Sequence, residues 1–288
     1  MTPRVDAHHH VWDLAVRDQE WITGEPMARI RRTFTLDDLA PATAAAGIGR
    51  TVVVQTLAVA AETPELLELA ASAPSLAGVV GWIDLTDPAA PDTLAALRGG
   101  LGGDRLVGVR HLVQAEDDPG WLCRPDVRRG IAAVGAAGLA YDLLTLPAQL
   151  PAAIGTARAL PEVTFVLDHL SKPPIASGAL EPWATLVREL AGLPNVYCKL
   201  SGMVTEADWA AWDVTSLRPY AETVLEAFGP ERVMFGSDWP VCLLAAGYAE
   251  VVAAAEEVCA GLSGAERDAV FGGTATRAYR LSDEGRPR

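Results

Sequence analysis

The chain has 288 residues, half of them hydrophobic, which is enough to bury the core of one large α/β domain. Its formal net charge of −14 argues against nucleic acid and anionic membrane surfaces as partners, because both attract an excess of Lys and Arg. No run of Gly, Ser or Pro resembles a linker, so we expect a single domain over residues 1–288.

Short β-branched segments alternate along the chain with longer Ala- and Leu-rich segments of helical period. Strands are predicted, in chain order, at residues 5–10, 51–55, 79–83, 107–112, 140–144, 164–169, 196–200 and 233–237. Helices are predicted at residues 36–46, 64–73, 126–137, 147–160, 180–191, 217–228, 249–260 and 264–279. Eight alternating units predict a single-domain (β/α)8 TIM barrel, since a doubly wound sheet usually has fewer strands and a Gly-x-Gly-x-x-Gly turn.

Reactive residues gather where the predicted strands end. In a (β/α)8 barrel, catalytic groups lie at the C-terminal ends of the strands and in the loops that follow. Six candidates occupy such positions: His8, His10, His111, His169, Lys199 and Asp238. A structural role is the alternative for each, such as a hydrogen-bonded histidine at the rim, a buried salt bridge for Lys199 or helix capping for Asp238.

The first two candidates belong to a triple histidine, residues 8–10. An extended backbone sends His8 and His10 to one face and His9 to the other. The two imidazoles then converge on a point where a metal ion or a hydrolytic water can sit. The alternative is a purification-tag remnant or a solvated tail, but the run is embedded in a patterned segment from Val5 to Asp13.

Five stretches carry a more specific pattern: Asp6-Ala-His-His-His-Val-Trp-Asp13, Gly108-Val-Arg-His111, Asp168-His-Leu-Ser-Lys-Pro-Pro174, Asn195-Val-Tyr-Cys-Lys-Leu-Ser-Gly202 and Phe235-Gly-Ser-Asp-Trp-Pro240. Together they resemble the amidohydrolase superfamily and, within it, the amidohydrolase-2 branch that contains the sugar lactonases of the L-fuconolactonase type. The resemblance implies a (β/α)8 barrel that hydrolyses a cyclic ester, most readily a sugar aldonolactone. It also implies a site at His8, His10, His169 and Asp238.

The same four residues are a suitable ligand set for one divalent metal ion, with Zn²⁺ the first expectation, because three imidazoles and a carboxylate leave room for a water. A metal-bound water ionises near pH ~7 and supplies a hydroxide that attacks an ester carbonyl. A second metal is not expected, since the fifth strand ends in Asp142-Leu-Leu-Thr145 without the bridging lysine or glutamate that many superfamily members carry. A metal-independent version is the alternative, in which the histidines and an arginine polarise the carbonyl directly.

Catalytic roles are expected for Asp238, His169, His111 and Lys199. Asp238 is the predicted general base, which takes a proton from water and returns it to the leaving ring oxygen. His111 and Lys199 are expected to donate hydrogen bonds to the carbonyl oxygen as it gains charge, or to contact substrate hydroxyls.

Substrate contacts are expected from loops beyond the first, fourth and eighth strands. Tryptophan faces can pack on the apolar side of a sugar ring, and hydroxyls need polar partners. The candidates are Trp12, Asp13, Trp21, Arg110, Gln114 and Trp239. Residues 12–32 are too long and polar for a simple connector and are predicted to form a lid or a wall of the mouth. Alternation along the strand predicts that Arg110 points away from His111.

Two other functions stay open. A decarboxylase of the same superfamily would use similar ligands on an aromatic or unsaturated carboxylate, and a barrel that only binds its ligand would show no turnover. We expect a small-molecule lactone as partner and a monomer or homodimer. No apolar run reaches the ~18 residues of a membrane span, and the first residues lack the apolar core of a signal peptide, so we expect a cytoplasmic protein.

Overall fold

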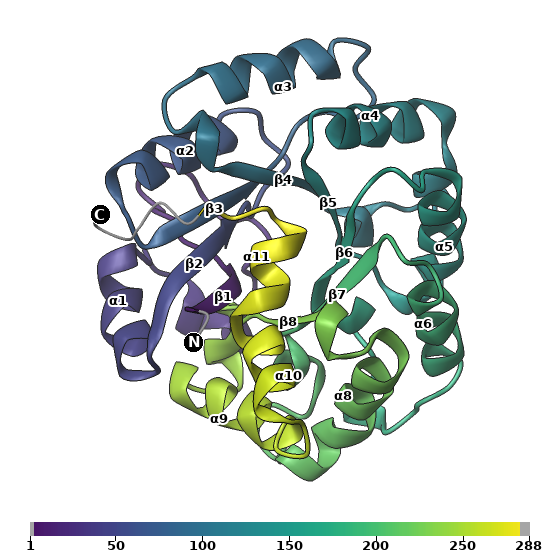
Figure 1. Ribbon diagram of the computed structural model, residues 1–288. Helices are drawn as coiled ribbons and strands as arrows, with labels where there is room; N and C mark the ends of the chain where they lie inside the picture. Colours follow the sequence, from purple (N-terminus) through teal and green to yellow (C-terminus); the bar gives the residue numbers. More distant parts are fainter. Residues whose placement is uncertain (1–2, 283–288) are drawn as a thin grey trace.

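A computed structural model describes residues 3–282. Eight parallel strands follow one another in chain order around a barrel, with the helices outside it (Figure 1). The strands are β1 (Arg4–His9), β2 (Ile48–Val54), β3 (Leu76–Gly81), β4 (Leu106–His111), β5 (Ala140–Leu143), β6 (Phe165–Leu167), β7 (Val196–Leu200) and β8 (Val233–Phe235). The predicted (β/α)8 barrel and its eight strands are confirmed.

The helices are α1 (Leu36–Ala45), α2 (Glu62–Ser72), α3 (Ala90–Gly99), α4 (Pro125–Ala136), α5 (Leu150–Ala159), α6 (Trp183–Ala191), α7 (Met203–Glu206), α8 (Val214–Phe228), α9 (Tyr248–Val258), α10 (Gly264–Asp268) and α11 (Thr274–Ala278). Two of them, α3 and α7, were not predicted. Helix α3 buries only Ala90 and Leu94 and ends at a pair of glycines, so its apolar period is weak. In the described part of the chain, no helix has the length and apolar character needed to cross a membrane.

The predicted closing helix over residues 264–279 is interrupted. A π-helical turn, Ala269–Gly273, separates α10 from α11. At Gly272 the chain passes so close to β1 that an added Cβ would lie 2.3 Å from the Pro3 carbonyl oxygen. The turn therefore lets the last helix pack against the start of β1, because π-turns shift the helical face locally.

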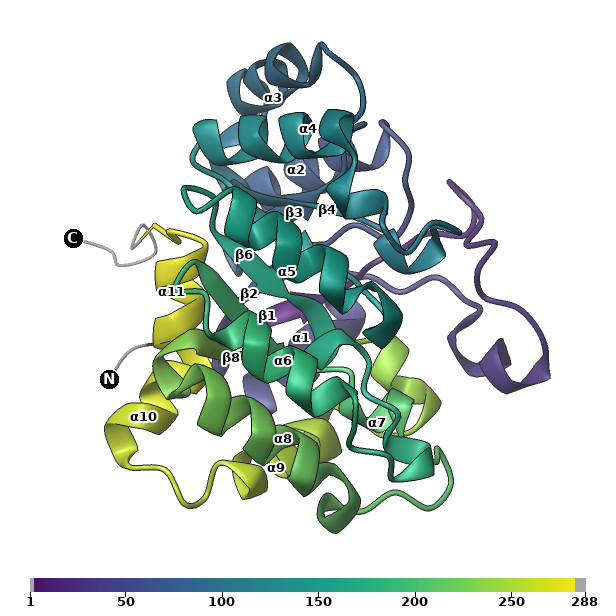
Figure 2. The same cartoon turned by 90° about the vertical axis from the view of Figure 1, so that its right-hand side faces the viewer.

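The floor of the barrel is closed by an apolar layer. Side chains from seven strands and from the segment around α11 form one buried cluster: Val5, Ala7, Val52, Val54, Ala77, Val80, Val107, Ala140, Val166, Met234, Ala275, Ala278, Tyr279 and Leu281. Such a cluster makes a barrel a packed core and not a pore. Figure 2 shows α10 and α11 on the same side of the barrel as the two termini, opposite the open mouth.

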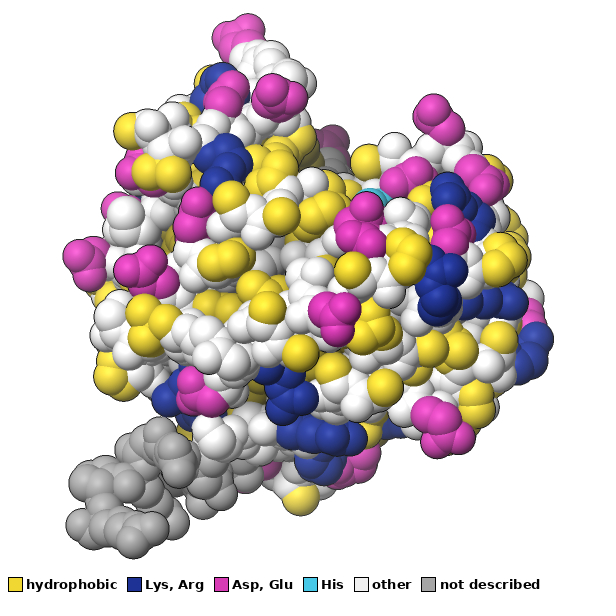
Figure 3. All heavy atoms as spheres, turned by 90° about the horizontal axis from the view of Figure 1, so that it is seen from above, with side chains coloured by type: hydrophobic (Ala, Val, Ile, Leu, Met, Phe, Trp, Pro, Cys, Tyr) yellow, Lys and Arg dark blue, Asp and Glu magenta, His cyan; other side chains and the backbone are white. Residues whose placement is uncertain are grey.

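The mouth is bordered by the long connection between β1 and α1. Figure 2 shows this purple segment, which includes the 3-10 turn Glu25–Ile30, projecting beyond the barrel on the side away from the termini. A space-filling view of one face shows acidic, basic and hydrophobic side chains interspersed (Figure 3). The projecting segment lies where a lid or mouth wall was predicted.

Candidate active site

Two histidines at the end of β1 point into the barrel, next to a register shift in that strand. Asp6 pairs with Thr51 of β2, but His9 pairs with Val53, so one extra residue is accommodated between them. His8 and His10, two residues apart, share a face as strand alternation predicts, with their Nε2 atoms 3.2 Å apart. His9 points the other way, where its Nε2 lies 3.0 Å from Thr51 Oγ1.

His10 is oriented by the end of β2. Its Nδ1 lies 2.7 Å from the Val54 carbonyl oxygen, a distance at which Nδ1 must carry the proton and donate. The Nε2 atom of His10 is therefore bare in the neutral ring and faces His8. A histidine held in this way is suited to accept a proton or ligate a metal ion through Nε2.

Asp238 reaches the histidines from the seam between β8 and β1. Its N–H donates to the His8 carbonyl oxygen at 2.8 Å, and its φ of +57° lies in the left-handed region. Its Oδ1 lies 3.5 Å from His10 Nε2 and 3.8 Å from His8 Nε2. The carboxylate thus faces the imidazoles and does not cap the following 3-10 helix, whose N-cap is Pro240.

His169 approaches the same carboxylate from β6. Its Nε2 lies 3.8 Å from Asp238 Oδ1, and its Nδ1 lies 2.9 Å from Ser201 Oγ. Gly202 leaves room for the ring, because a Cβ at that position would lie 2.7 Å from His169 Nδ1. The three histidines and Asp238 therefore share one space at the C-terminal ends of β1, β6 and β8.

The backbone at His169 is strained. Four consecutive residues, His169 to Lys172, have φ values of 49°, 54°, 58° and 50°. For residues other than glycine, a left-handed turn costs about 1–2 kcal/mol per residue, and such turns concentrate at functional sites. Strand β6 was predicted to continue to His169, but it ends at Leu167 because this turn begins immediately afterwards.

The electrostatics of the site favour an ionised carboxylate among neutral rings. Burial alone would raise the pKa of Asp238, but His169, His10 and Lys172 outweigh it and hold that pKa below its ordinary value. Burial lowers the pKa of His169 to about 4. Burial also lowers the pKa of His8 well below its ordinary value, and the charge of Lys199 adds to this. At neutral pH, Asp238 is ionised while His8 and His169 are uncharged.

A fully buried layer of charges lies beneath the histidines. Lys199 donates to Asp142 Oδ2 at 2.6 Å, and its Nζ forms an ion pair with Asp168 Oδ1 at 2.9 Å. Arg110 Nη1 donates to Asp168 Oδ2 at 3.0 Å, and Nη2 donates to the Gln55 carbonyl oxygen. Two cations and two carboxylates balance within this layer. Burial of charge at this depth requires such pairing.

The charge layer touches both the site and the barrel floor. Lys199 Nζ lies 3.0 Å from His8 Nδ1, and Arg110 Nη1 lies 3.4 Å from His8 Nε2. From below, the hydroxyl of Tyr279 donates to Asp142 Oδ2 at 2.7 Å. Lys199 is completely buried, so it takes the salt-bridge arrangement that the sequence left open as its alternative. The layer supports His8 from below.

His8, His10 and Asp238 are spaced to hold one divalent metal ion. Ligand atoms around a tetrahedral zinc lie about 3.3 Å apart, because Zn–N and Zn–O bonds are ~2.0–2.2 Å. His8 Nε2 and His10 Nε2 lie 3.2 Å apart, and Asp238 Oδ1 lies 3.5 Å from His10 Nε2 and 3.8 Å from the Nε2 atoms of His8 and His169. His8, His10 and Asp238 form one compact set of candidate ligands, and His8, His169 and Asp168 form another.

His111 lies apart from this set, at the rim beside β3. Trp82 Nε1 donates to His111 Nδ1 at 3.0 Å, and His111 Nε2 lies 2.8 Å from Glu116 Oε1. Its ring also stacks on Trp121, with centroids 4.2 Å apart. The predicted opposition along β4 is observed, with Arg110 inside the barrel and His111 outside. His111 therefore has the hydrogen-bonded rim arrangement that was its alternative.

The predicted tryptophans pack mostly against one another. Trp12 contacts Trp21 and Phe34 in edge-to-face geometry, with centroids 5.7 and 5.5 Å apart, and Phe34 contacts Trp239 at 5.2 Å. Trp12 and Trp239 are buried, whereas Trp21 is partly exposed. The cluster anchors the segment between β1 and α1. Of its three tryptophans, Trp21 has the largest exposed fraction.

Asp13 and Gln114 are placed differently. Asp13 Oδ1 accepts hydrogen bonds from Thr33 Oγ1 and Ala15 N, each at 2.9 Å. Gln114 lies in the 3-10 turn Val113–Ala115, and its Oε1 is buried without a hydrogen-bond partner among the described residues. A buried acceptor that lacks a partner is available to a ligand donor.

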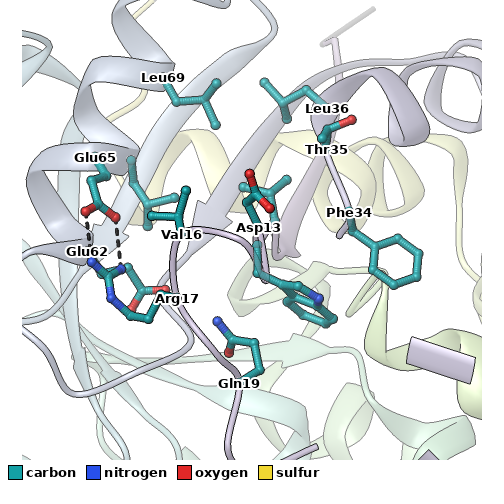
Figure 4. A pocket seen from close by; sticks show the side chains of 13 residues that line it. Asp13, Val16, Arg17, Gln19, Phe34, Thr35, Leu36, Glu62, Glu65 and Leu69 are labelled. Carbon is teal, nitrogen blue, oxygen red and sulfur yellow. Dashed lines mark hydrogen bonds and ion pairs between the residues drawn. The ribbon is translucent and has the colours of Figure 1, made fainter. Parts of the chain in front are cut away.

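A cavity of about 310 Å³ adjoins the segment after β1 (Figure 4). Trp12 and Asp13 line it together with apolar side chains of α1 and α2, including Leu36 and Leu69. The ion pair between Arg17 and Glu65 crosses its edge, as the dashed lines show. The cavity lies on the α2 side of the segment, and the four candidate ligands are not among its lining residues.

Comparison with known proteins supplies the family. The amidohydrolase family model (Amidohydro_2) matches residues 5–281. This chain belongs to the amidohydrolase family. The amidohydrolase is 40% identical over 285 residues to L-fucono-1,5-lactonase of Burkholderia ambifaria, with 98% of this chain and 97% of the relative covered. It is 42% identical over 291 residues to L-fucono-1,5-lactonase of Burkholderia multivorans, with 97% of each covered.

A solved structure agrees with these relatives. The amidohydrolase resembles an amidohydrolase of Burkholderia multivorans, determined with zinc bound, at a TM-score of 0.92 and 42% identity. The match covers 97% of this chain and 100% of the other. The family assignment therefore rests on the sequence and on the fold of nearly the whole chain.

The residues that sequence reasoning missed in this amidohydrolase lie mainly below and beside the histidines. They are Asp6, Asp142, Asp168, Ser201 and Tyr279. A signal for the charge layer was present, because Arg110, Asp142, Asp168 and Lys199 are charged residues at the ends of otherwise apolar strands. Such residues need partners when they are buried.

Proposed function

We propose that this amidohydrolase opens the cyclic ester of sugar aldonolactones, and that L-fucono-1,5-lactone is the substrate to test first. The observation that carries the proposal is the similarity, about 40% identity over nearly the whole chain, to two L-fucono-1,5-lactonases. The site offers what ester hydrolysis needs, namely an ionised carboxylate next to imidazoles in a buried setting.

Asp238 is the general base in this proposal. Its carboxylate is ionised at neutral pH and is only about 4% exposed, so few water molecules can compete for it. It removes a proton from the water that attacks the lactone carbonyl. The same carboxyl group then returns the proton to the ring oxygen as the ester bond breaks, which keeps the proton count balanced.

The imidazoles orient the substrate and stabilise charge on its carbonyl oxygen. His169 Nε2 and His8 Nε2 lie on the same side as Asp238 Oδ1, each 3.8 Å away. Donors held in a buried site stabilise a developing oxyanion more strongly than donors in water do. Arg110 supports His8 from the layer below, 3.4 Å from its Nε2.

His8, His10, His169 and Asp238 are also the residues that would hold a divalent metal ion, Zn²⁺ first among the candidates. When bound, such an ion lowers the pKa of a coordinated water and polarises the carbonyl. His10 is already arranged for ligation through Nε2, because its Nδ1 donates to the Val54 carbonyl oxygen. The ligand types and their separations support this assignment.

The test is proton release on a panel of aldonolactones: L-fucono-1,5-lactone, L-rhamnono, L-galactono and D-arabinono lactones. Each assay is run with untreated, chelator-treated and zinc-restored protein. Turnover that chelation removes and zinc restores supports both the lactonase and the metal. Turnover that is indifferent to chelation supports a metal-independent lactonase. No proton release on any lactone, with CO₂ release from an aromatic carboxylate, would replace the proposal with the decarboxylase alternative.

A further inference from the structure

Three cations approach the histidine cluster, and two of them are already neutralised. Arg110 and Lys199 lie in the buried layer, at most 2% exposed, and are ion-paired with Asp142 and Asp168. The third, Lys172, ends the turn that follows β6, and its side chain is 25% exposed. It is the cation of this group that a substrate can reach from solvent.

The left-handed turn after β6 places Lys172 beside His169. A turn with about three residues per repeat brings positions i and i+3 to the same side. The turn is closed by the N–H of Lys172, which donates to the His169 carbonyl oxygen at 2.7 Å. Consistent with proximity to the centre, the positive charge of Lys172 contributes to lowering the pKa of both His169 and Asp238.

The two middle residues of the turn, Leu170 and Ser171, are held by different parts of the chain. Trp183 Nε1 of α6 donates to the Leu170 carbonyl oxygen at 2.7 Å. Ser171 Oγ lies 2.8 Å from Thr145 Oγ1, beyond the end of β5. A strained backbone persists only where its surroundings determine it, and strain of this kind marks functional positions. Both ends of the strained turn, His169 and Lys172, carry side chains that suit the reaction.

Among residues 3–282, Lys172 has one ion-pair partner, and that partner is replaceable. Its Nζ lies 3.3 Å from Glu206 Oε1 of α7, and the Glu206 side chain is 24% exposed. A single ion pair whose side chains are both in contact with solvent adds little to stability, so the ammonium can exchange Glu206 for another anion at small cost. Hydrolysis of a lactone produces such an anion, because the ester becomes a carboxylate.

We propose that Lys172 is a substrate-binding residue, whose ammonium leaves Glu206 to bind the carbonyl oxygen of the lactone and then the carboxylate of the product. This inference rests on the proposed lactonase function and names a residue for it. Lys172 thus provides a mobile positive charge on the open side of the centre, opposite the fixed charges of Arg110 and Lys199.

Substitutions at the two residues of the ion pair, Lys172 and Glu206, provide matched variants. Lys172→Met should lower kcat/KM on L-fucono-1,5-lactone at least 100-fold and weaken inhibition by L-fuconate at least tenfold. Glu206→Gln should stay within threefold of the unsubstituted chain in kcat/KM and in inhibition by L-fuconate, because this substitution leaves the Lys172 ammonium free to bind substrate. Lys172→Arg should recover part of the loss. If the pair were only structural, Lys172→Met and Glu206→Gln would cause equal losses in activity and in Tm, and the inference would be wrong.

Failure of this inference can be told apart from failure of the lactonase proposal. Lactone turnover by the unsubstituted chain tests the lactonase alone. Full kcat/KM in Lys172→Met would remove the role of Lys172 and leave the lactonase standing. If the unsubstituted chain opens no lactone, calorimetry with L-fuconate still decides: at least tenfold weaker binding to Lys172→Met supports the anion site, and equal binding overturns it.

Discussion

Lys199 Nζ lies 3.0 Å from His8 Nδ1, and this contact determines which ring nitrogen of His8 carries the proton. An ammonium has hydrogens to donate and no lone pair to accept with, so His8 Nδ1 must be the acceptor. In the neutral ring, the proton is then on Nε2 and points towards His10 Nε2, which is bare and 3.2 Å away. Arg110 Nη1 donates to Asp168 Oδ2 at 3.0 Å and lies farther from His8 Nε2, at 3.4 Å, so the lysine contact is the shorter of the two to His8. A metal ion at His8 Nε2 requires the opposite tautomer, with Nδ1 donating to Asp168 Oδ1, 3.4 Å away.

Removing the lysine should therefore favour metal binding. Lys199→Met alone leaves Asp142 as an unpaired buried charge, which costs about 3–5 kcal/mol of folding free energy. The double variant Lys199→Met/Asp142→Asn keeps the net charge, and Asp168 becomes free to accept from His8. We expect the double variant to bind Zn²⁺ about tenfold more tightly than the unsubstituted chain, in competition with a chelator. Unchanged or weaker zinc binding by a folded double variant would contradict the tautomer argument.

Asp6 joins β1 to the segment after β8 that contains Asp238, and we call this junction the Asp6 seam. Its Oδ1 accepts from His8 N at 3.1 Å and from Ser237 N at 2.9 Å, and its Oδ2 accepts from the Tyr248 hydroxyl at 3.0 Å. Asp6→Ala leaves three buried donors without a partner, at about 1–3 kcal/mol each. We expect a loss of several kcal/mol of stability, measured by denaturant unfolding, and a fall in kcat.

Two tyrosine variants test whether the hydrogen bonds of Asp6 affect kcat beyond their effect on stability. Tyr248→Phe removes one of the three hydrogen bonds and should cost only about 1 kcal/mol. Tyr220→Phe is the matched control, because the Tyr220 hydroxyl donates to the Ala179 carbonyl oxygen, outside the site. Tyr248→Phe should lower kcat more than Tyr220→Phe does at equal loss of stability. Equal kcat in the two variants would show that the Asp6 seam does not position Asp238.

Gly202 should be needed for the His169 ring. Both Gly202 and Gly178 have positive φ, 66° and 71°, so alanine at either position carries the same backbone penalty of about 1 kcal/mol. A Cβ at Gly202 would lie 2.7 Å from His169 Nδ1, whereas a Cβ at Gly178 meets nothing within 4 Å. We expect Gly202→Ala to lose at least tenfold in kcat and Gly178→Ala to keep its activity. Similar kcat values in the two variants would disprove the spacing argument.

Stability should fall as the pH drops below neutrality. Burial lowers the pKa of His169 to about 4 and that of His9 to about 3, and it lowers the pKa of His8 as well. The unfolded chain protonates these rings near pH ~6.5, so it binds more protons than the folded chain below that pH. The stability from the neutral rings is complete above pH ~6.5 and is lost as the pH falls towards the folded values.

Two carboxylates oppose this trend without reversing it. Burial raises the pKa of Asp142 to about 6 and also raises that of Asp6, so the folded chain gains protons there first. Three histidines outweigh two carboxylates, and we expect the Tm to be lower at pH 5.5 than at pH 7. His9→Gln should reduce this difference by more than a third, because the three rings contribute about equally between pH 7 and pH 5.5 and the two carboxylates subtract from their sum. A Tm that is equal or higher at pH 5.5 would show that the histidines are not buried as neutral rings.

The barrel could be predicted from the sequence because hydrophobic alternation and segment length are local properties. The convergence of His8 and His10 was also predictable, since it follows from the two-residue period of a strand. The left-handed turn after β6 could not be foreseen, because residues 169–172 contain no glycine and nothing local requires positive φ. Its cause is tertiary, in hydrogen bonds to the turn from α6 and from the end of β5.

The sequence also could not predict which of Arg110 and His111 faces the inside of the barrel. Alternation along β4 requires the two side chains to face opposite ways, but it does not say which one faces the barrel. Their partners decide it, because Arg110 finds Asp168 inside and His111 finds Trp82 and Glu116 outside. Pairing of charges from different strands depends on the closed barrel and cannot be read from one strand alone.

The central claim is that Asp238 acts on a lactone bound among the three histidines. The most direct measurement is ring opening of L-fucono-1,5-lactone followed by NMR, with the unsubstituted chain and with Asp238→Asn at matched concentrations. We expect the unsubstituted chain to exceed the spontaneous rate and Asp238→Asn to lose at least 1,000-fold in kcat while keeping its Tm, because the amide keeps the shape but cannot accept the proton. Near-normal turnover by Asp238→Asn would contradict the assigned base, and no turnover above the spontaneous rate by the unsubstituted chain would contradict the lactonase itself.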